Sequence, residues 1–123
     1  PNLFIMQGPN TGLGHTSVIY MIEAQIKQMM KVLKHMQKNQ LDVIEPSADA
    51  QDGFVENTEK SMKGTVWTSG GCKSWYLDHT GRNSTLWPGS TYSFSRLAGK
   101  VVTRDYIGRQ ASSETEVPAR KVK

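Results

Sequence analysis

The sequence has one cysteine, Cys72, among its 123 residues, so no disulfide can form within the chain. It also lacks an apolar run long enough to cross a membrane, and its first residues do not have the pattern of a signal peptide. We therefore expect a cytoplasmic protein that does not associate with a membrane. A hydrophobic content of 37% still allows a small globular core.

Metal ligands are also scarce in this sequence. His15 has no cysteine or carboxylate at the spacing of a metal site, and Cys72 with Asp78 and His79 falls short of the usual ligand count. We expect no metal, and we assign no catalytic residue to this chain.

Charge is present in moderate excess, with a formal net charge of +4. Much of it lies on lysines spaced by three or four residues, at positions 27, 31, 34 and 38. That spacing predicts a solvated helix face more readily than a binding stripe, and no nucleic-acid motif accompanies it. We expect no nucleic-acid partner.

The first third of the sequence predicts a strand, a turn and a long helix. The apolar run Leu3–Met6 is typical of a buried strand, and glycines at 8, 12 and 14 allow a sharp turn. From Thr16 to Gln40, apolar residues recur every three or four positions, as in an amphipathic helix. The apolar stripe is formed by Ile19, Ile22, Ile26, Met29, Leu33 and Met36, and it favours packing onto the sheet of a larger domain over a coiled coil.

The remainder predicts further mixed structure. Residues 41–45 are extended, and Ser47 caps a second helix that runs to about Lys63. Strands over 74–77 and 91–95 would form a β-hairpin, and the polar chain beyond residue 104 predicts a disordered tail. The fold class is α/β.

The turn nearly satisfies a dinucleotide fingerprint between Gly12 and Ser17. Ser17 replaces the third glycine, and Glu45 lies too far along the chain to contact a ribose. A pyrophosphate-binding turn is therefore the less favoured interpretation.

Two blocks of sequence resemble one enzyme family. The first is Gly8-Pro9-Asn10-Thr11-Gly12-Leu13-Gly14-His15, and the second includes Gly70-Gly71-Cys72-Lys73-Ser74-Trp75-Tyr76-Leu77-Asp78 and Gly81-Arg82-Asn83-Ser84-Thr85-Leu86-Trp87-Pro88-Gly89. Both resemble the C-terminal part of FAD-dependent monooxygenases of the Baeyer-Villiger and flavin-containing type, in the form seen in hydroxyacetophenone monooxygenases. The resemblance covers about residues 1–96.

The resemblance implies a piece of a longer enzyme. Members of the family have one G-x-G-x-x-G turn for FAD and a second for NADP, and neither occurs here. We expect a C-terminal piece of a flavoprotein with two dinucleotide-binding domains, inactive alone. Residues 1–46 would complete the FAD-binding domain, 47–104 would form the second helix and a hairpin lid, and 105–123 the tail.

The resemblance also implies cofactor contacts. The residues expected to bind cofactor are Gly8, Pro9, Asn10, Thr11, Gly12 and Trp75. Backbone N–H groups near Asn10 and Thr11 would face the pyrimidine side of the flavin, and Trp75 would contact NADPH from a mobile loop. Two structural alternatives stay open: a turn merely capped by Asn10, and aromatic residues that are simply the packed core of the hairpin.

Two functions follow from these observations. The resemblance implies a parent that uses FAD and NADPH to insert oxygen into a ketone or to oxidise an amine or sulfide, with its catalytic arginine outside this chain. The alternative is a non-catalytic truncated product that acts, or self-associates, through the helix lined with isoleucine and methionine.

Overall fold

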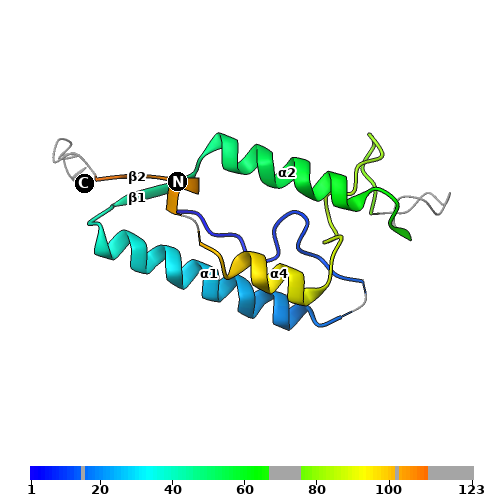
Figure 1. The fold of residues 1–123 in the computed structure, drawn as a ribbon, viewed down its shortest axis with the longest axis horizontal. Helices are drawn as coiled ribbons and strands as arrows, with labels where there is room; N and C mark the ends of the chain where they lie inside the picture. Colours follow the sequence, from blue (N-terminus) through cyan, green and yellow to red (C-terminus); the bar gives the residue numbers. More distant parts are fainter. Residues whose placement is uncertain (15, 67–75, 102, 111–123) are drawn as a thin grey trace, which may run out of the picture.

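The computed structural model describes residues 1–14, 16–66, 76–101 and 103–110. Its elements, in chain order, are α1 (Val18–Lys38), β1 (Val43–Pro46), α2 (Ala48–Met62), α4 (Thr91–Ala98), a short 3₁₀ helix (Thr103–Asp105) and β2 (Tyr106–Arg109). In Figure 1, α4 lies along α1, and the N-terminal segment runs between this pair and α2. The two short strands lie together at one end of the molecule.

The long helix and the second helix form where the sequence predicts them. Ser17 caps α1 by accepting a hydrogen bond from the Tyr20 N–H, and Ser47 caps α2 through the Ala50 N–H. These hydroxyl groups satisfy N–H donors that have no partner within the first helical turn. Both predicted helices are therefore confirmed.

The apolar stripe predicted on α1 for contact with a larger domain is not the side of the helix that packs within this chain. The buried residues are Met21, Ala24, Gln25 and Val32, whereas Ile19 is 69% exposed and Ile26 is 43% exposed. Ile22, Met29 and Met36 of the predicted stripe are half-buried. At about 100° per residue, the centre of the buried set is turned by about 110° from the centre of that stripe. α4 takes this other side because small Ala24 and flexible Met21 allow a close approach.

The strand predicted over 91–95 is instead the helix α4. Ser90 accepts a hydrogen bond from the Ser93 N–H, as an N-cap residue does. Phe94 and Ala98, four residues apart, are both buried. Helical periodicity and a serine cap therefore outweigh the aromatic and β-branched composition that suggested a strand.

The predicted hairpin is likewise reduced to a single antiparallel bridge between Leu77 and Asn83. Residues 74 and 75 of its first strand lie outside the described residues. Because its second strand is α4, no two-stranded hairpin joins these segments.

The sheet is a two-stranded antiparallel ribbon that includes part of the predicted tail. Val43 faces Arg109 and Pro46 faces Tyr106, so the prediction of disorder is wrong for 106–109. An ion pair between Arg109 and Glu45, 3.1 Å apart, accompanies the pairing. Residues 111–123 of the predicted tail lie outside the described residues.

The strand predicted at Leu3–Met6 does not form in this chain. Asn2 is hydrogen-bonded to β1: its N–H donates to the Ile44 carbonyl and its Oδ1 accepts from the Ile44 N–H. Leu3 is 77% exposed and Ile5 is 62% exposed. No described strand lies beside residues 3–6 to complete a ladder, so Leu3 and Ile5 remain exposed while Phe4 and Met6 are half-buried.

The core lies between α1 and α4. Met21, Ala24, Phe94 and Ala98 form the buried cluster, and Leu13 and Trp87 pack against it. The Trp87 ring meets Phe94 edge-on at 5.4 Å and stacks on Phe54 of α2 at 6.5 Å. Lys31 also donates to the Gly99 carbonyl at the end of α4. Trp87 is therefore the side chain that joins all three helices.

Candidate flavin-facing turn and a neighbouring pocket

The two sequence blocks that carry the family resemblance meet in space. The Asn10 N–H donates to the Ser84 carbonyl at 2.8 Å, and the Gly12 N–H donates to the Thr85 carbonyl at 2.9 Å. In return the Gly12 carbonyl accepts from the Trp87 N–H at 2.8 Å. We call residues 10–12 together with 83–87 the interlock. It fixes the glycine-rich turn to a loop more than 70 residues away in sequence.

Asn10 is the central side chain of the interlock. It is 5% exposed, and its Nδ2 donates to the Asn83 carbonyl at 2.9 Å and to the Leu86 carbonyl at 3.1 Å. Its φ of 56° lies in the left-handed region, which asparagine tolerates better than most residues. Asn10 thus holds the loop and does not cap α1, whose cap is Ser17.

Gly12 is required by close approach between backbones. A Cβ atom at this position would lie 2.9 Å from the Thr85 carbonyl oxygen, which cannot move without breaking the interlock. Gly8 differs, because the nearest atom to a Cβ there is the Ile5 carbonyl oxygen at 3.7 Å. The chain itself therefore needs glycine at position 12 and tolerates a side chain at position 8.

A hollow of about 490 Å³ lies beside the interlock. It is lined by Ile5, Gln7, Gly8, Pro9, Gly12, Ser84 and Thr85. The buried Thr11 donates its hydroxyl to the Gly8 carbonyl at 2.5 Å, and its N–H has no partner in the described part of the chain. Gly8, Pro9 and Gly12 therefore border a space that a ligand can enter.

The six residues predicted to bind cofactor separate into three groups. Gly8, Pro9 and Gly12 line the hollow. Asn10 and Thr11 are buried behind it, and the N–H of Asn10 is already bound to Ser84. Trp75 lies outside the described residues. Trp87 is a packed aromatic residue, but it packs against the core between α1 and α4 and not within a hairpin.

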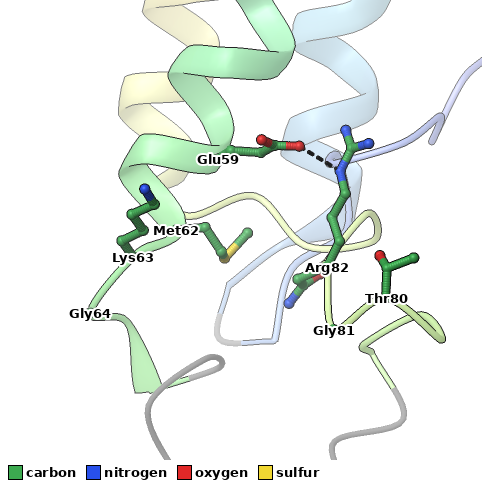
Figure 2. A pocket seen from close by; sticks show the side chains of 8 residues that line it. Glu59, Met62, Lys63, Gly64, Thr80, Gly81 and Arg82 are labelled. Carbon is green, nitrogen blue, oxygen red and sulfur yellow. Dashed lines mark ion pairs between the residues drawn. The ribbon is translucent and has the colours of Figure 1, made fainter.

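A second pocket, of about 510 Å³, lies between the end of α2 and the turn at 80–83 (Figure 2). It is lined by Glu59, Met62, Lys63, Gly64, Thr80, Gly81, Arg82 and Asn83. Figure 2 shows the Arg82 side chain extending toward Glu59, and their ion pair measures 2.8 Å. Sequence analysis did not predict this pocket, because its two sides come from segments about 20 residues apart with no shared motif.

The turn that forms one side of this pocket is organised by Asp78. One oxygen of its carboxylate accepts from the Thr80 hydroxyl at 2.6 Å, the Thr80 N–H at 2.8 Å and the Arg82 N–H at 3.0 Å. The bond from the Thr80 hydroxyl, then that from the Arg82 N–H, lowers the pKa of Asp78 below its usual value of 3.8. The turn is thus most ordered when Asp78 is ionised.

Two negative observations concern only the residues that the structure describes. These residues contain no group of three histidine, cysteine or acidic side chains placed to hold a metal ion. None of their helices combines the length and apolar character that crossing a membrane requires.

Known proteins similar to this chain are monooxygenases. A Baeyer-Villiger monooxygenase from Pseudomonas aeruginosa is 49% identical over 98 residues, which cover 79% of this chain and 19% of the relative. Another, from Streptomyces coelicolor, is 42% identical over 86% of this chain and 21% of its own length. An FAD-binding monooxygenase from Aspergillus niger is 31% identical over 92% of this chain.

The chain therefore spans about a fifth of the length of the relatives that it matches. No protein-family model and no solved structure matches it. The relatives, and not a structural likeness, carry the assignment.

Proposed function

Because its sequence belongs with the Baeyer-Villiger and FAD-binding monooxygenases, we propose that this chain forms one wall of the flavin site in a longer enzyme of that family. That enzyme would use FAD, reduced by NADPH, to transfer one oxygen atom of O₂ to a ketone, an amine or a sulfide. Identity of 42–49% to two Baeyer-Villiger monooxygenases supports the chemistry. A cytoplasmic location agrees with the single Cys72.

The observation that supports the flavin wall most is the hollow beside the interlock. Gly8, Pro9 and Gly12 line it, and the neighbouring Thr11 N–H has no partner among the described residues. Pro9 has no N–H and the Gly12 N–H is bound to Thr85, so neither supplies a free donor. An unpaired backbone N–H such as that of Thr11 favours a planar ring whose oxygen and nitrogen atoms carry negative charge. Since the Asn10 N–H binds Ser84, the role of Asn10 is to hold the wall in place, and Thr11 is the better candidate donor.

The hollow would supply one wall of the site, and the G-x-G-x-x-G turn with which the family binds FAD does not occur in this sequence. We therefore expect the isolated chain to bind FAD with a dissociation constant weaker than about 0.1 mM, which corresponds to at most ~5.5 kcal/mol. Purified chain should be colourless after desalting. Stoichiometric flavin absorbance in that sample would contradict the proposed single wall.

A role in NADPH binding rests on the resemblance at Trp75. Its replacement by alanine in the longer enzyme should raise KM for NADPH and leave FAD content unchanged, because the loop would close over the nicotinamide and not over the flavin. If Trp75 is a packed core residue, truncation should instead lower stability by about 3–5 kcal/mol and leave NADPH kinetics normal.

The side of α1 that faces away from α4 supports a partner within the same enzyme. Ile19, Ile26, Met30 and Leu33 are each 39–69% exposed, and we call them the outward face. Their spacing of seven, four and three residues places them on one stripe about 20 Å long. We propose that the remaining four fifths of the enzyme cover this face, and that it drives self-association of the isolated chain.

The proposal can be tested by transplantation. A chimera of the Pseudomonas aeruginosa relative, in which this chain replaces the 98 matching residues, should purify with FAD bound as fully as the unaltered relative. A second chimera carrying Gly12→Ala should lose FAD, since the added methyl group disrupts the interlock. A folded first chimera without FAD would refute the assignment of this segment to a flavin site.

A further inference from the structure

The pocket at the end of α2 contains a buried polar group without a partner. Asn83 is 5% exposed and lines this pocket. Its Oδ1 accepts hydrogen bonds from the Thr85 N–H at 3.1 Å and the Leu86 N–H at 3.0 Å. Its Nδ2 has no partner in the structure. Exchanging the amide oxygen and nitrogen of Asn83 would break both existing bonds, so these two bonds fix the orientation of the amide. The nitrogen is therefore the atom without a partner.

A buried N–H donor without an acceptor costs free energy, and native proteins rarely keep one without a reason. The unpaired Nδ2 therefore indicates that a ligand with a hydrogen-bond acceptor binds in the pocket. The acceptor must be small, because the Nδ2 lies below the protein surface.

The other polar groups of the pocket are also donors. The Nε of Arg82 is paired with Glu59, and the terminal guanidinium nitrogens have no partner among the residues described. Lys63 is exposed and makes no ion pair within this part of the chain. The chain turns sharply at Gly64, just after α2, where φ is 79°. The Gly64 N–H donates no hydrogen bond to any other described residue.

Among the side chains that line the pocket, the charged acceptor is already paired. Glu59 is the only carboxylate among the lining residues, and it is bound to Arg82. The Thr80 hydroxyl donates to Asp78 and belongs to the turn. With two cations and one anion, the lining has a net positive charge as well as an excess of donors.

We propose that this pocket binds a small oxyanion, a phosphate or carboxylate group, with Asn83 Nδ2 donating to one of its oxygen atoms. Arg82 and Lys63 supply the opposite charge at the rim, and hydrogen bonds to a charged acceptor are stronger than those to a neutral one. The site is distinct from the hollow at Gly8–Gly12, and its existence does not depend on the flavin proposal.

The experiment uses the complete 123-residue chain and three separate probes. Inorganic phosphate, sodium acetate and sodium chloride are titrated at constant ionic strength while ¹H–¹⁵N spectra record the Asn83 side-chain amide and the Gly64 backbone amide. Saturable shifts of both signals with phosphate alone identify a phosphate site, and saturable shifts with acetate identify a carboxylate site. Shifts no larger than those with chloride would overturn the proposal.

Three variants separate the site from general charge effects. Asn83→Asp keeps both acceptor bonds to Thr85 and Leu86 but removes the donor and adds repulsion, so the affinity should fall at least about tenfold. Lys63→Gln should weaken binding about threefold to fivefold. Lys60→Gln is the matched control, because Lys60 lies on the same helix and is paired with Glu56 at 2.6 Å, outside the pocket.

Unchanged affinity in a folded Asn83→Asp variant would contradict the assignment. If that variant does not fold, the comparison of Lys63→Gln with Lys60→Gln decides. Equal affinities for these two would also overturn the proposal.

Discussion

The interlock and the outward face of α1 differ in whether their side chains find partners within this chain. In the interlock, Asn10 and Gly12 are bonded to residues of the same chain, and its central side chain is buried. On the outward face, isoleucine and leucine side chains lie exposed although they follow a regular apolar pattern. The hydrogen bonds of Asn10 and Gly12 are therefore made within the described residues, whereas the apolar side chains of the outward face remain exposed there.

If the chain is part of a longer enzyme, as proposed above, this difference indicates how such a segment divides its contacts. Directional hydrogen bonds fix the local shape of the turn, and non-directional apolar surface remains for contact with the rest of the protein. Substitutions in the interlock should thus weaken the isolated chain, and substitutions on the outward face should not.

The largest expected effect is that of Asn10→Ala. It leaves the carbonyl groups of Asn83 and Leu86 without their donor, and it places alanine at a φ of 56°. We expect a loss of about 2–4 kcal/mol in the free energy of unfolding, measured by urea denaturation. Asn57→Ala, on the exposed surface of α2, is the control and should change stability by less than about 0.5 kcal/mol. Equal stabilities of the two variants would show that the interlock is not a structural unit.

The helices were predictable because their signals are local. Ser17 and Ser47 lie immediately before periodic apolar runs, and the resulting caps form as expected. Ser90 with Phe94 and Ala98 carries the same local signals for α4, but Thr91, Tyr92 and Phe94 also favour a strand.

The interlock was not predictable from residue patterns. The bonds from Asn10 to Asn83 and Leu86 join positions more than 70 residues apart, and no spacing rule connects them. The family resemblance selected both blocks without indicating that they touch. For residues 3–6, a strand pattern was present, but a strand also requires a neighbour, which the described residues do not supply.

The next largest effects on the free energy of unfolding are expected for two glycine-to-alanine substitutions, which should act in opposite directions. Gly12→Ala should cost about 1–3 kcal/mol, because its Cβ would lie 2.9 Å from the Thr85 carbonyl oxygen. Gly53→Ala, within α2 and with no atom within 4 Å of the new Cβ, should add about 0.5–1 kcal/mol. Thermal unfolding of both variants checks the difference. Stabilisation by Gly12→Ala would mean that the close approach is absent.

The outward face should respond weakly in the isolated chain. Ile26→Gln is expected to change the free energy of unfolding by less than about 0.5 kcal/mol and to reduce self-association in sedimentation experiments. In the chimera with the Pseudomonas aeruginosa relative, the same substitution should lower the melting temperature, because the polar side chain would then be buried. An unchanged melting temperature in the chimera would show that no partner covers this face.

The smallest effect is expected at the exposed Asp78 turn. Because its folded-state pKa is lowered, the contribution of its carboxylate to stability is present above pH 3.8 and is lost as the pH falls through the folded pKa. The protection factors for amide exchange at Thr80 and Arg82, which are corrected for the intrinsic pH dependence of exchange, should fall in that acidic range. Asp78→Asn should remove this fall. Protection factors that do not change with pH in the unaltered chain would contradict the role of this carboxylate.

The central claim, that the glycine-rich turn faces the flavin, is tested most directly by Gly8→Ala. In the isolated chain the new Cβ meets its nearest atom at 3.7 Å, so the free energy of unfolding should not change. In the chimera, the methyl group enters the space between turn and ring, and the dissociation constant of FAD should rise about tenfold. An unchanged FAD dissociation constant, measured in a chimera of normal stability, would show that the turn does not contact the flavin.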